Sequence, residues 1–253
     1  MKICIIGNSH TVCIDRAWRD MHESYPDVSL TFHRRSGQYF NQFRADTHNK
    51  ILTITDASSK SRIQQSSGGD GTIDFSQFDI CLLIGATRYR WPARVAQLGG
   101  QAKAGYSAQA ITAAAKDLFA SSHPSVIFPV IREVSDIPVY QLHDPFLAHP
   151  KGWSGAQLKH DYRYYDYPRG VDLMNEIVYS PLGSELIRQP AETFAAENWT
   201  KPGFAVGLKK PFPAQVKAGF TDEMKDDRRH MNSDFGKIRL LDTFDKLGIK
   251  PAP

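Results

Sequence analysis

Two short polar blocks, one near each end of the 253-residue chain, hold the residue types of a serine nucleophile and its base. Ser9 lies in Gly-Asn-Ser-His directly after an apolar run, whereas Asp227 and His230 lie in Asp-Arg-Arg-His. A serine hydroxyl is a poor nucleophile at neutral pH, so it needs a base within hydrogen-bond reach and a group that orients this base. The spacing lets Asp227 and His230 turn toward one point from a single loop or helical turn. We therefore predict that Ser9 is the nucleophile, His230 the general base and Asp227 its orienting carboxylate.

Each block also has a simpler interpretation. Asn and Ser are common helix caps, and a lone Asp-x-x-His is usually two polar surface residues. Asp226 is a second candidate for the orienting carboxylate, although the spacing favours Asp227. We expect His10, which follows Ser9, to point away from the site and to make a local hydrogen bond at a helix start.

Strand-like and helix-like segments alternate along much of the chain. Apolar runs, apolar–polar alternation and helical spacing of apolar residues are the patterns used to assign them. The predicted strands are 3–6, 28–32, 80–84 and 126–128, and the predicted helices are 11–23, 104–120 and the segment from 237 to a stop at Gly248. This order indicates the α/β class: a three-layer α/β/α sandwich around a parallel sheet. Ligands are expected beyond the carboxyl ends of the strands, where Ser9, Gly37 and Thr87 fall.

Two stretches follow this pattern less well. Residues 46–77 are polar apart from a strand-like patch at 51–54, and we expect a surface hairpin or excursion there. Residues 134–225 are rich in Pro, Gly and aromatic residues, with a helix candidate at 171–179. This long excursion either packs its aromatic side chains on the domain or acts as a lid over the substrate pocket. We expect residues 1–253 to form a single domain that includes both stretches.

The two polar blocks resemble those of the SGNH/GDSL hydrolase superfamily, in which the nucleophile follows the first strand and an Asp-x-x-His precedes the last helix. The resemblance spans nearly the whole chain, with Asn8 in place of the more usual Asp. It implies a flavodoxin-like fold and an oxyanion hole that includes the N–H groups of Ser9 and Gly37. Thr87 stands where the family usually has the Asn of Gly-x-Asn, and loss of an oxyanion donor costs on the order of 3 kcal/mol. Thr87, Arg88 or a backbone N–H is therefore the candidate third donor, and Asn8 and Arg88 are candidate substrate contacts.

This resemblance implies an esterase that forms an acyl-serine intermediate and needs no cofactor. Its substrate would be a small-molecule or carbohydrate acyl ester. One alternative is an O-acyltransferase in polysaccharide biosynthesis, which would pass the acyl group to a sugar hydroxyl instead of water. Another is a catalytically silent SGNH-like protein that binds carbohydrate. The Thr at the Asn position favours the silent protein, whereas the presence of Ser, His and Asp together favours an enzyme.

Composition narrows the remaining possibilities. The net charge is +4 and the basic residues lie in scattered pairs, which argues against nucleic acid as the main partner. Three cysteines without a CxxC spacing predict buried thiols in a reducing compartment. The first apolar run is too short for a signal peptide or membrane span, so we expect a cytoplasmic protein. His143, Asp144 and His149 lack the spacing of zinc ligands, and no metal is expected.

Overall fold

Five parallel strands form the central sheet of the computed structural model, which describes residues 1–34, 40–67, 71–100, 106–149, 166–196, 199–206 and 227–252. The strands are, in spatial order, β2 (Ser29–Arg34), β1 (Lys2–Gly7), β6 (Ile80–Ile84), β7 (Val139–Leu142) and β8 (Ser184–Ile187). All four neighbouring pairs are parallel. Counted in chain order, the five strands have the spatial order 2-1-3-4-5, which is that of flavodoxin-like folds. The predicted fold class is thereby confirmed.

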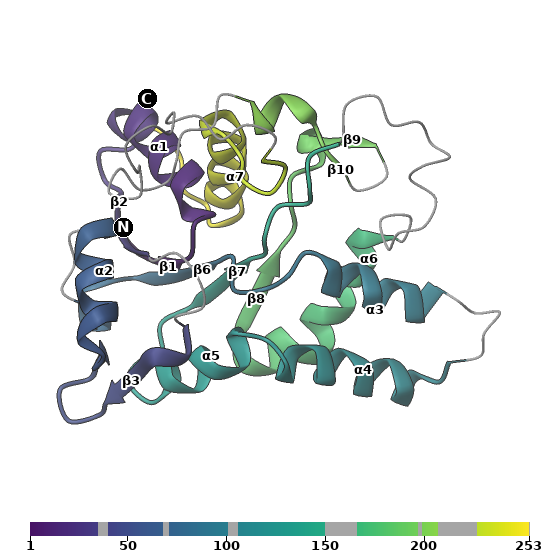
Figure 1. Cartoon of the computed structure of the whole chain (residues 1–253), viewed down its shortest axis with the longest axis horizontal. Helices are drawn as coiled ribbons and strands as arrows, with labels where there is room; N and C mark the ends of the chain where they lie inside the picture. The colour runs from purple at the N-terminus through teal and green to yellow at the C-terminus, as the bar shows by residue number, and fades with distance from the viewer. Residues whose placement is uncertain are drawn as a thin grey trace.

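One face of the sheet is covered by α1 (Thr11–Met21) and α7 (Ser233–Lys246), which lie side by side (Figure 1). Gly236 makes their close approach possible, because a Cβ there would lie only 2.1 Å from the backbone oxygen of Cys13. Arg239 ties α7 to the sheet, since its buried guanidinium donates to the carbonyl of Ile187 at the end of β8. The first and last helices therefore form one packed unit.

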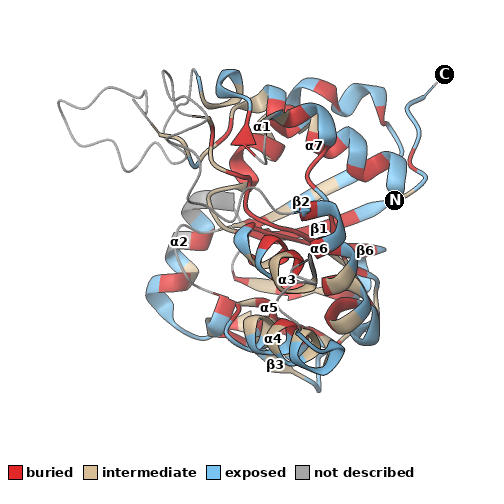
Figure 2. Ribbon diagram, turned by 90° about the vertical axis from the view of Figure 1, so that its right-hand side faces the viewer, coloured by how far each residue is buried: buried red, intermediate tan, exposed pale blue. Residues whose placement is uncertain are grey.

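The opposite face is covered by helices from the middle of the chain. These are α3 (Arg90–Gly100), α4 (Ala108–Ala120), α5 (Pro124–Arg132) and α6 (Tyr167–Met174), which continues as a π-helix over Asn175–Tyr179. Figure 2 shows the buried residues of the sheet between the two helical layers, with exposed residues on the outer sides of the helices. The structure is thus an α/β/α sandwich, as predicted.

A small antiparallel sheet adds to this second layer. It contains β3 (Phe43–Asp46), β4 (Ile51–Ile54) and β5 (Thr72–Asp74), and α2 (Ala57–Ser67) connects β4 to β5. Leu52 and Ile54 are fully buried and belong to the same core cluster as the inward residues of α5. The strand-like patch at 51–54 is confirmed as β4, and β3 and β4 form the expected hairpin. The hairpin is not a surface excursion, because its inward side chains belong to the core.

The predicted helix–strand pattern needs two further corrections. Residues 126–128 form part of helix α5 rather than a strand, with Pro124 in its first turn, where a missing N–H costs nothing. The stretch predicted as an excursion, 134–225, supplies the sheet strands β7 and β8. Its described part also contains the helix expected at 171–179, as α6 and the π-helix.

The remaining elements are short. Strands β9 (Phe194–Ala196) and β10 (Trp199–Thr200) form an antiparallel pair, and single 3-10 turns occupy His22–Ser24, Phe40–Gln42, Phe75–Gln77, Ser180–Leu182, Ala191–Thr193 and Pro202–Ala205. The predicted buried thiols are confirmed, because Cys4, Cys13 and Cys81 are all buried and free. Within the described ranges, no helix has both the length and the apolar character needed to cross a bilayer.

Candidate functional site

Ser9 lies in the turn between β1 and α1. Strand β1 is buried from Ile3 to Gly7, so the chain leaves the core at its carboxyl end and turns at residues 8–10. The carbonyl of Ser9 accepts the N–H of Val12 at 3.3 Å, which begins the helical bonding of α1. The Ser9 side chain therefore sits at the amino end of a helix, where the backbone dipole favours negative charge.

The structure brings the three residues of the two polar blocks together. The Oγ of Ser9 lies 2.8 Å from Nε2 of His230, and the other ring nitrogen, Nδ1, lies 2.7 Å from Oδ2 of Asp227. Both distances are those of ordinary hydrogen bonds. With Nδ1–H donating to Asp227, Nε2 is free to accept the serine proton. This arrangement can activate a hydroxyl for attack on an acyl carbon.

The other carboxylate oxygen of Asp227 shapes the loop itself. Oδ1 accepts the backbone N–H groups of Arg229 at 2.8 Å and of His230 at 3.2 Å. Burial opposes ionisation of Asp227, but the hydrogen bonds from His230 and from the backbone outweigh it and hold its pKa below the ordinary value. Asp227 is therefore ionised at neutral pH and fixed in place from both of its oxygens.

Arg228, which lies between Asp227 and His230 in the sequence, anchors their loop to Ala148 in the segment after β7. Its Nε donates to the carbonyl of Ala148 at 2.8 Å, and its own carbonyl accepts the N–H of Ala148 at 2.9 Å. The guanidinium also lies over the ring of Trp199, 5.0 Å from the centroid. Reasoning from sequence missed this role, since an Arg-Arg pair usually indicates solvated surface.

Asn8 links the nucleophile turn to the neighbouring strand. Its Nδ2 donates to the carbonyl of Gly85 at 2.8 Å, and its Oδ1 accepts the N–H of His10 at 3.0 Å. Gly85 has φ +73°, and a Cβ at this position would lie 2.3 Å from Oδ1 of Asn8. Each polar atom of the amide thus makes a hydrogen bond inside the protein, and the substrate contact predicted for Asn8 stays a prediction.

His10 lies against His230 instead of pointing away from the site. The two rings are stacked, with centroids 5.1 Å apart and an angle of 28° between the planes. Nε2 of His10 lies 3.6 Å from Oδ1 of Asp144, whose Oδ2 lies 3.6 Å from the guanidinium of Arg88. Arg88 is half-exposed, whereas the other side chains of this chain of contacts are largely buried.

Thr87 does not present its hydroxyl to the surface. The residue is fully buried, and its Oγ1 lies 2.9 Å from the hydroxyl of Tyr179. Its carbonyl accepts the N–H of Asp144 at 2.9 Å. The side chain that replaces the expected Asn is therefore committed to the interior, which does not favour the donor role predicted for it.

Two other residues named from the sequence lie outside the described ranges. These are Gly37, the predicted second oxyanion donor, and Asp226, the alternative orienting carboxylate. Both stay predictions. Asp144 was weighed from the sequence only as a metal ligand. Its position after β7 would have marked it as a site residue, had that strand been recognised.

Comparisons with known proteins give two similar solved structures. One is a lipase, Lip_vut3, from a goat rumen metagenome, with 13% identity over 99% of this chain and 98% of the other, at a TM-score of 0.45. The second is a catalytic mutant of Axe2, an acetylxylan esterase from Geobacillus stearothermophilus, with 12% identity over 98% of this chain and 94% of the other, at a TM-score of 0.39. No protein-family model matches the sequence, and no curated protein matches it.

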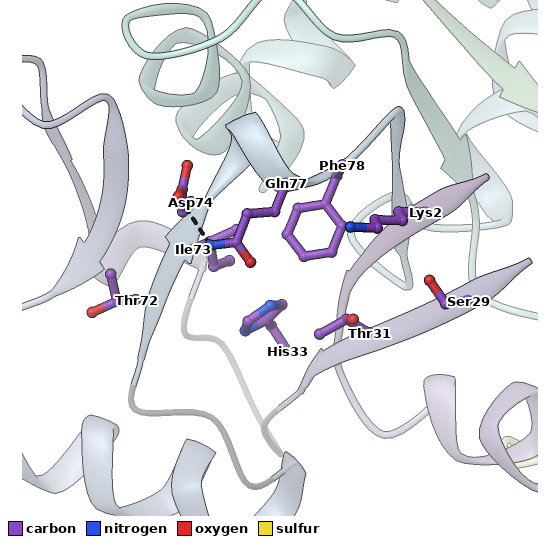
Figure 3. Close-up of a pocket in the computed structure, with 9 residues that line it drawn as sticks. All are labelled: Lys2, Ser29, Thr31, His33, Thr72, Ile73, Asp74, Gln77 and Phe78. Carbon is purple, nitrogen blue, oxygen red and sulfur yellow. Dashed lines mark hydrogen bonds between the residues drawn. The ribbon is translucent and has the colours of Figure 1, made fainter.

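A separate cavity of about 470 Å³ lies between the edge strand β2 and strand β5 (Figure 3). Its lining residues are Lys2, Ser29, Thr31, His33, Thr72, Ile73, Asp74, Gln77 and Phe78. Among them, Gln77 donates to Asp74 at 3.0 Å, as the dashed line in the figure marks. None of the residues gathered around Ser9 lines this cavity. Across the described part of the chain, no three His, Cys, Asp or Glu side chains form a metal-binding group.

Proposed function

We propose that this protein is a serine hydrolase of ester bonds that forms an acyl intermediate on Ser9. The observation that carries the proposal is the 2.8 Å contact between Ser9 Oγ and His230 Nε2, with Asp227 on the other ring nitrogen. The resemblance of the two polar blocks to SGNH hydrolases supports the same reaction.

The reaction follows from the hydrogen bonds. Ser9 Oγ attacks the ester carbonyl carbon while Nε2 of His230 takes its proton, and Asp227 stabilises the imidazolium that results. The tetrahedral intermediate collapses when His230 returns that proton to the departing alcohol, leaving an acyl-Ser9 ester. Water, deprotonated by His230, then attacks the acyl carbon. As the bond to Oγ breaks, His230 returns this proton to Ser9, which releases the carboxylic acid and free Ser9.

Hydrogen-bond donors must stabilise the negative charge that develops on the carbonyl oxygen in the tetrahedral intermediate. The proposed donors are the N–H of Ser9, which lies just before α1, and the N–H of Gly37, both of which the SGNH resemblance implies. We assign no donor role to the Thr87 hydroxyl, because it bonds to Tyr179 in the interior.

We propose a carbohydrate O-acyl group as the substrate, with the half-exposed Arg88 as a contact beside the site. An acyltransferase would use the same three residues, because His230 would deprotonate a sugar hydroxyl in place of water. The two activities differ only in the acceptor. Ester turnover in water therefore separates them.

The test is labelling with a fluorophosphonate probe together with hydrolysis of a chromogenic acetyl ester. The wild type should react with both, and Ser9→Ala with neither. His230→Gln should lose at least about 10³-fold in hydrolysis, since it removes the base. Equal labelling of the wild type and Ser9→Ala, or no labelling of either, would contradict the proposal. Labelling without ester turnover would favour transfer to a specific acceptor over hydrolysis.

A further inference from the structure

We propose that His10 is a positioning residue for His230: its ring supports one face of the His230 imidazole and keeps Nε2 directed at Ser9. The proposal rests on the proposed function and adds to it a residue outside the Ser–His–Asp set. It is the stacked contact, with centroids 5.1 Å apart, that carries the inference.

His10 is itself held firmly. Its backbone N–H donates to Oδ1 of Asn8 at 3.0 Å, and Asn8 is bonded in turn to the carbonyl of Gly85 at the end of β6. Its side chain is only 13% exposed, so it has little freedom to leave the stack. Because His10 directly follows Ser9, the same turn places the nucleophile and the support for its base.

Asp144 lies beside the Nε2 atom of the His10 ring. Its side chain is 8% exposed, and within the described residues its Oδ1 has no hydrogen-bond partner. A buried polar atom without a partner is costly, and Nε2 of His10 lies 3.6 Å away, a few tenths of an ångström beyond a hydrogen bond. Asp144 therefore borders the His10 ring closely without a hydrogen bond to it.

The charge state of His10 suits a supporting role. Burial lowers the pKa of His10 to about 3, so the ring is neutral while the reaction proceeds. The titratable and charged groups around it are His230, Asp227, Arg88, Arg229, Asp144 and His143. A neutral aromatic face packs favourably against the imidazolium that His230 becomes, whereas a protonated His10 would repel it.

The experiment compares two substitutions of similar size. His10→Phe keeps a flat ring without its nitrogens, and His10→Leu fills the space without a flat face. For each variant, the rate of Ser9 labelling by a fluorophosphonate is measured against probe concentration, which separates the limiting rate from probe affinity. We expect His10→Leu to lose about 10- to 100-fold in limiting rate with little change in affinity, as for a misplaced base. His10→Phe should recover most of this loss.

A matched control is His22→Leu, which replaces an exposed histidine at the end of α1. Its labelling should equal that of the wild type. If His10→Leu labels as fast as His10→Phe, or if only affinity changes, the positioning role is overturned while the proposed function stands. If the wild type shows no Ser9-dependent labelling, the proposed function fails and the positioning role falls with it. Thermal unfolding of each variant checks that the compared proteins are folded.

Discussion

Nε of Arg228 donates to the backbone carbonyl of Ala148 at 2.8 Å, and so ties the loop that carries Asp227 and His230 to the segment after β7. The loop is thereby fixed at its centre. The same bond therefore limits the movement of Asp227 and His230, which lie on either side of Arg228 in the sequence.

Arg228→Leu should therefore weaken both stability and reactivity. The change removes a hydrogen bond from a charged donor and the cation–π contact with Trp199, together worth about 2–4 kcal/mol. We expect lower urea stability and slower labelling of Ser9. Arg229→Leu is the matched control, because the Arg229 side chain is exposed and only its backbone bonds to Asp227. Equal losses in the two variants would show that charge, not anchoring, is what matters.

Gly236→Ala should destabilise the protein although alanine is the better helix former. The helical preference alone favours Ala by about 1 kcal/mol. The added Cβ would lie 2.1 Å from the backbone oxygen of Cys13, so α1 and α7 must separate, which costs about 1–3 kcal/mol. Urea unfolding measures the net loss. Gly203→Ala is the control, since a Cβ there meets nothing within 4 Å. A stabilised Gly236→Ala would refute the close packing of the two helices.

Substitution of Thr87 distinguishes an interior role from an oxyanion role. Thr87→Val leaves the buried Tyr179 hydroxyl unpaired, which costs about 1–3 kcal/mol of stability. Tyr179→Phe should cost a similar amount, and the double variant less than the sum of the two. Labelling of Ser9 should change little in all three. A loss of about 100-fold in labelling by Thr87→Val alone would instead identify its hydroxyl as an oxyanion donor.

Acid should destabilise the fold through its buried histidines. Burial lowers the pKa of His10 and of His143 to about 3, so below pH 6.5 the unfolded chain binds protons that the folded chain excludes. The free energy of unfolding then falls with falling pH, by up to about 1.4 kcal/mol per pH unit for each group. Burial raises the pKa of Asp144 to about 7, which has the opposite sign, because the folded state retains this proton above pH 3.8. Between about pH 4 and 6.5, the proton retained by Asp144 thus cancels the contribution of one of the two histidines to the pH dependence of stability.

Urea unfolding between pH 4.5 and 6.5 checks these signs. Compared with the wild type, Asp144→Asn should steepen the dependence of stability on pH, because the offsetting group is gone. His143→Gln should flatten it, because one of the two excluded protons is gone. Identical slopes in the three proteins would mean that these groups do not titrate as their burial indicates.

Sequence patterns predicted strands with a continuous apolar run or a clear apolar–polar alternation, such as β1, β6 and β2, and missed β7 and β8. The continuous apolar runs of β1 and β6 were unambiguous. By contrast, β7 holds the buried Gln141 and β8 holds Ser184 and Glu185, so neither reads as a sheet core. The short apolar run 126–128 is compatible with strand or helix, and the two flanking prolines did not decide between them.

Some residues of the candidate site could likewise be predicted from the sequence, and others could not. Ser9, Asp227 and His230 could be named because their types and spacing belong to a known chemistry. The contact between His10 and His230 could not, since it depends on how tightly the turn after β1 bends. Asp144 was missed with the strand that precedes it, and Thr87 could be located but not oriented.

The packing of α1 against α7 also determines when during folding the Ser9–His230 pair can form. Ser9 is synthesised before its base, because His230 lies 221 residues later in the chain, and the two meet only when α7 has docked on α1. A nascent or truncated chain therefore displays an ordinary, unactivated serine. Reactivity at Ser9 then reports completion of folding, and a labelling probe would count finished molecules in a mixture with unfinished ones.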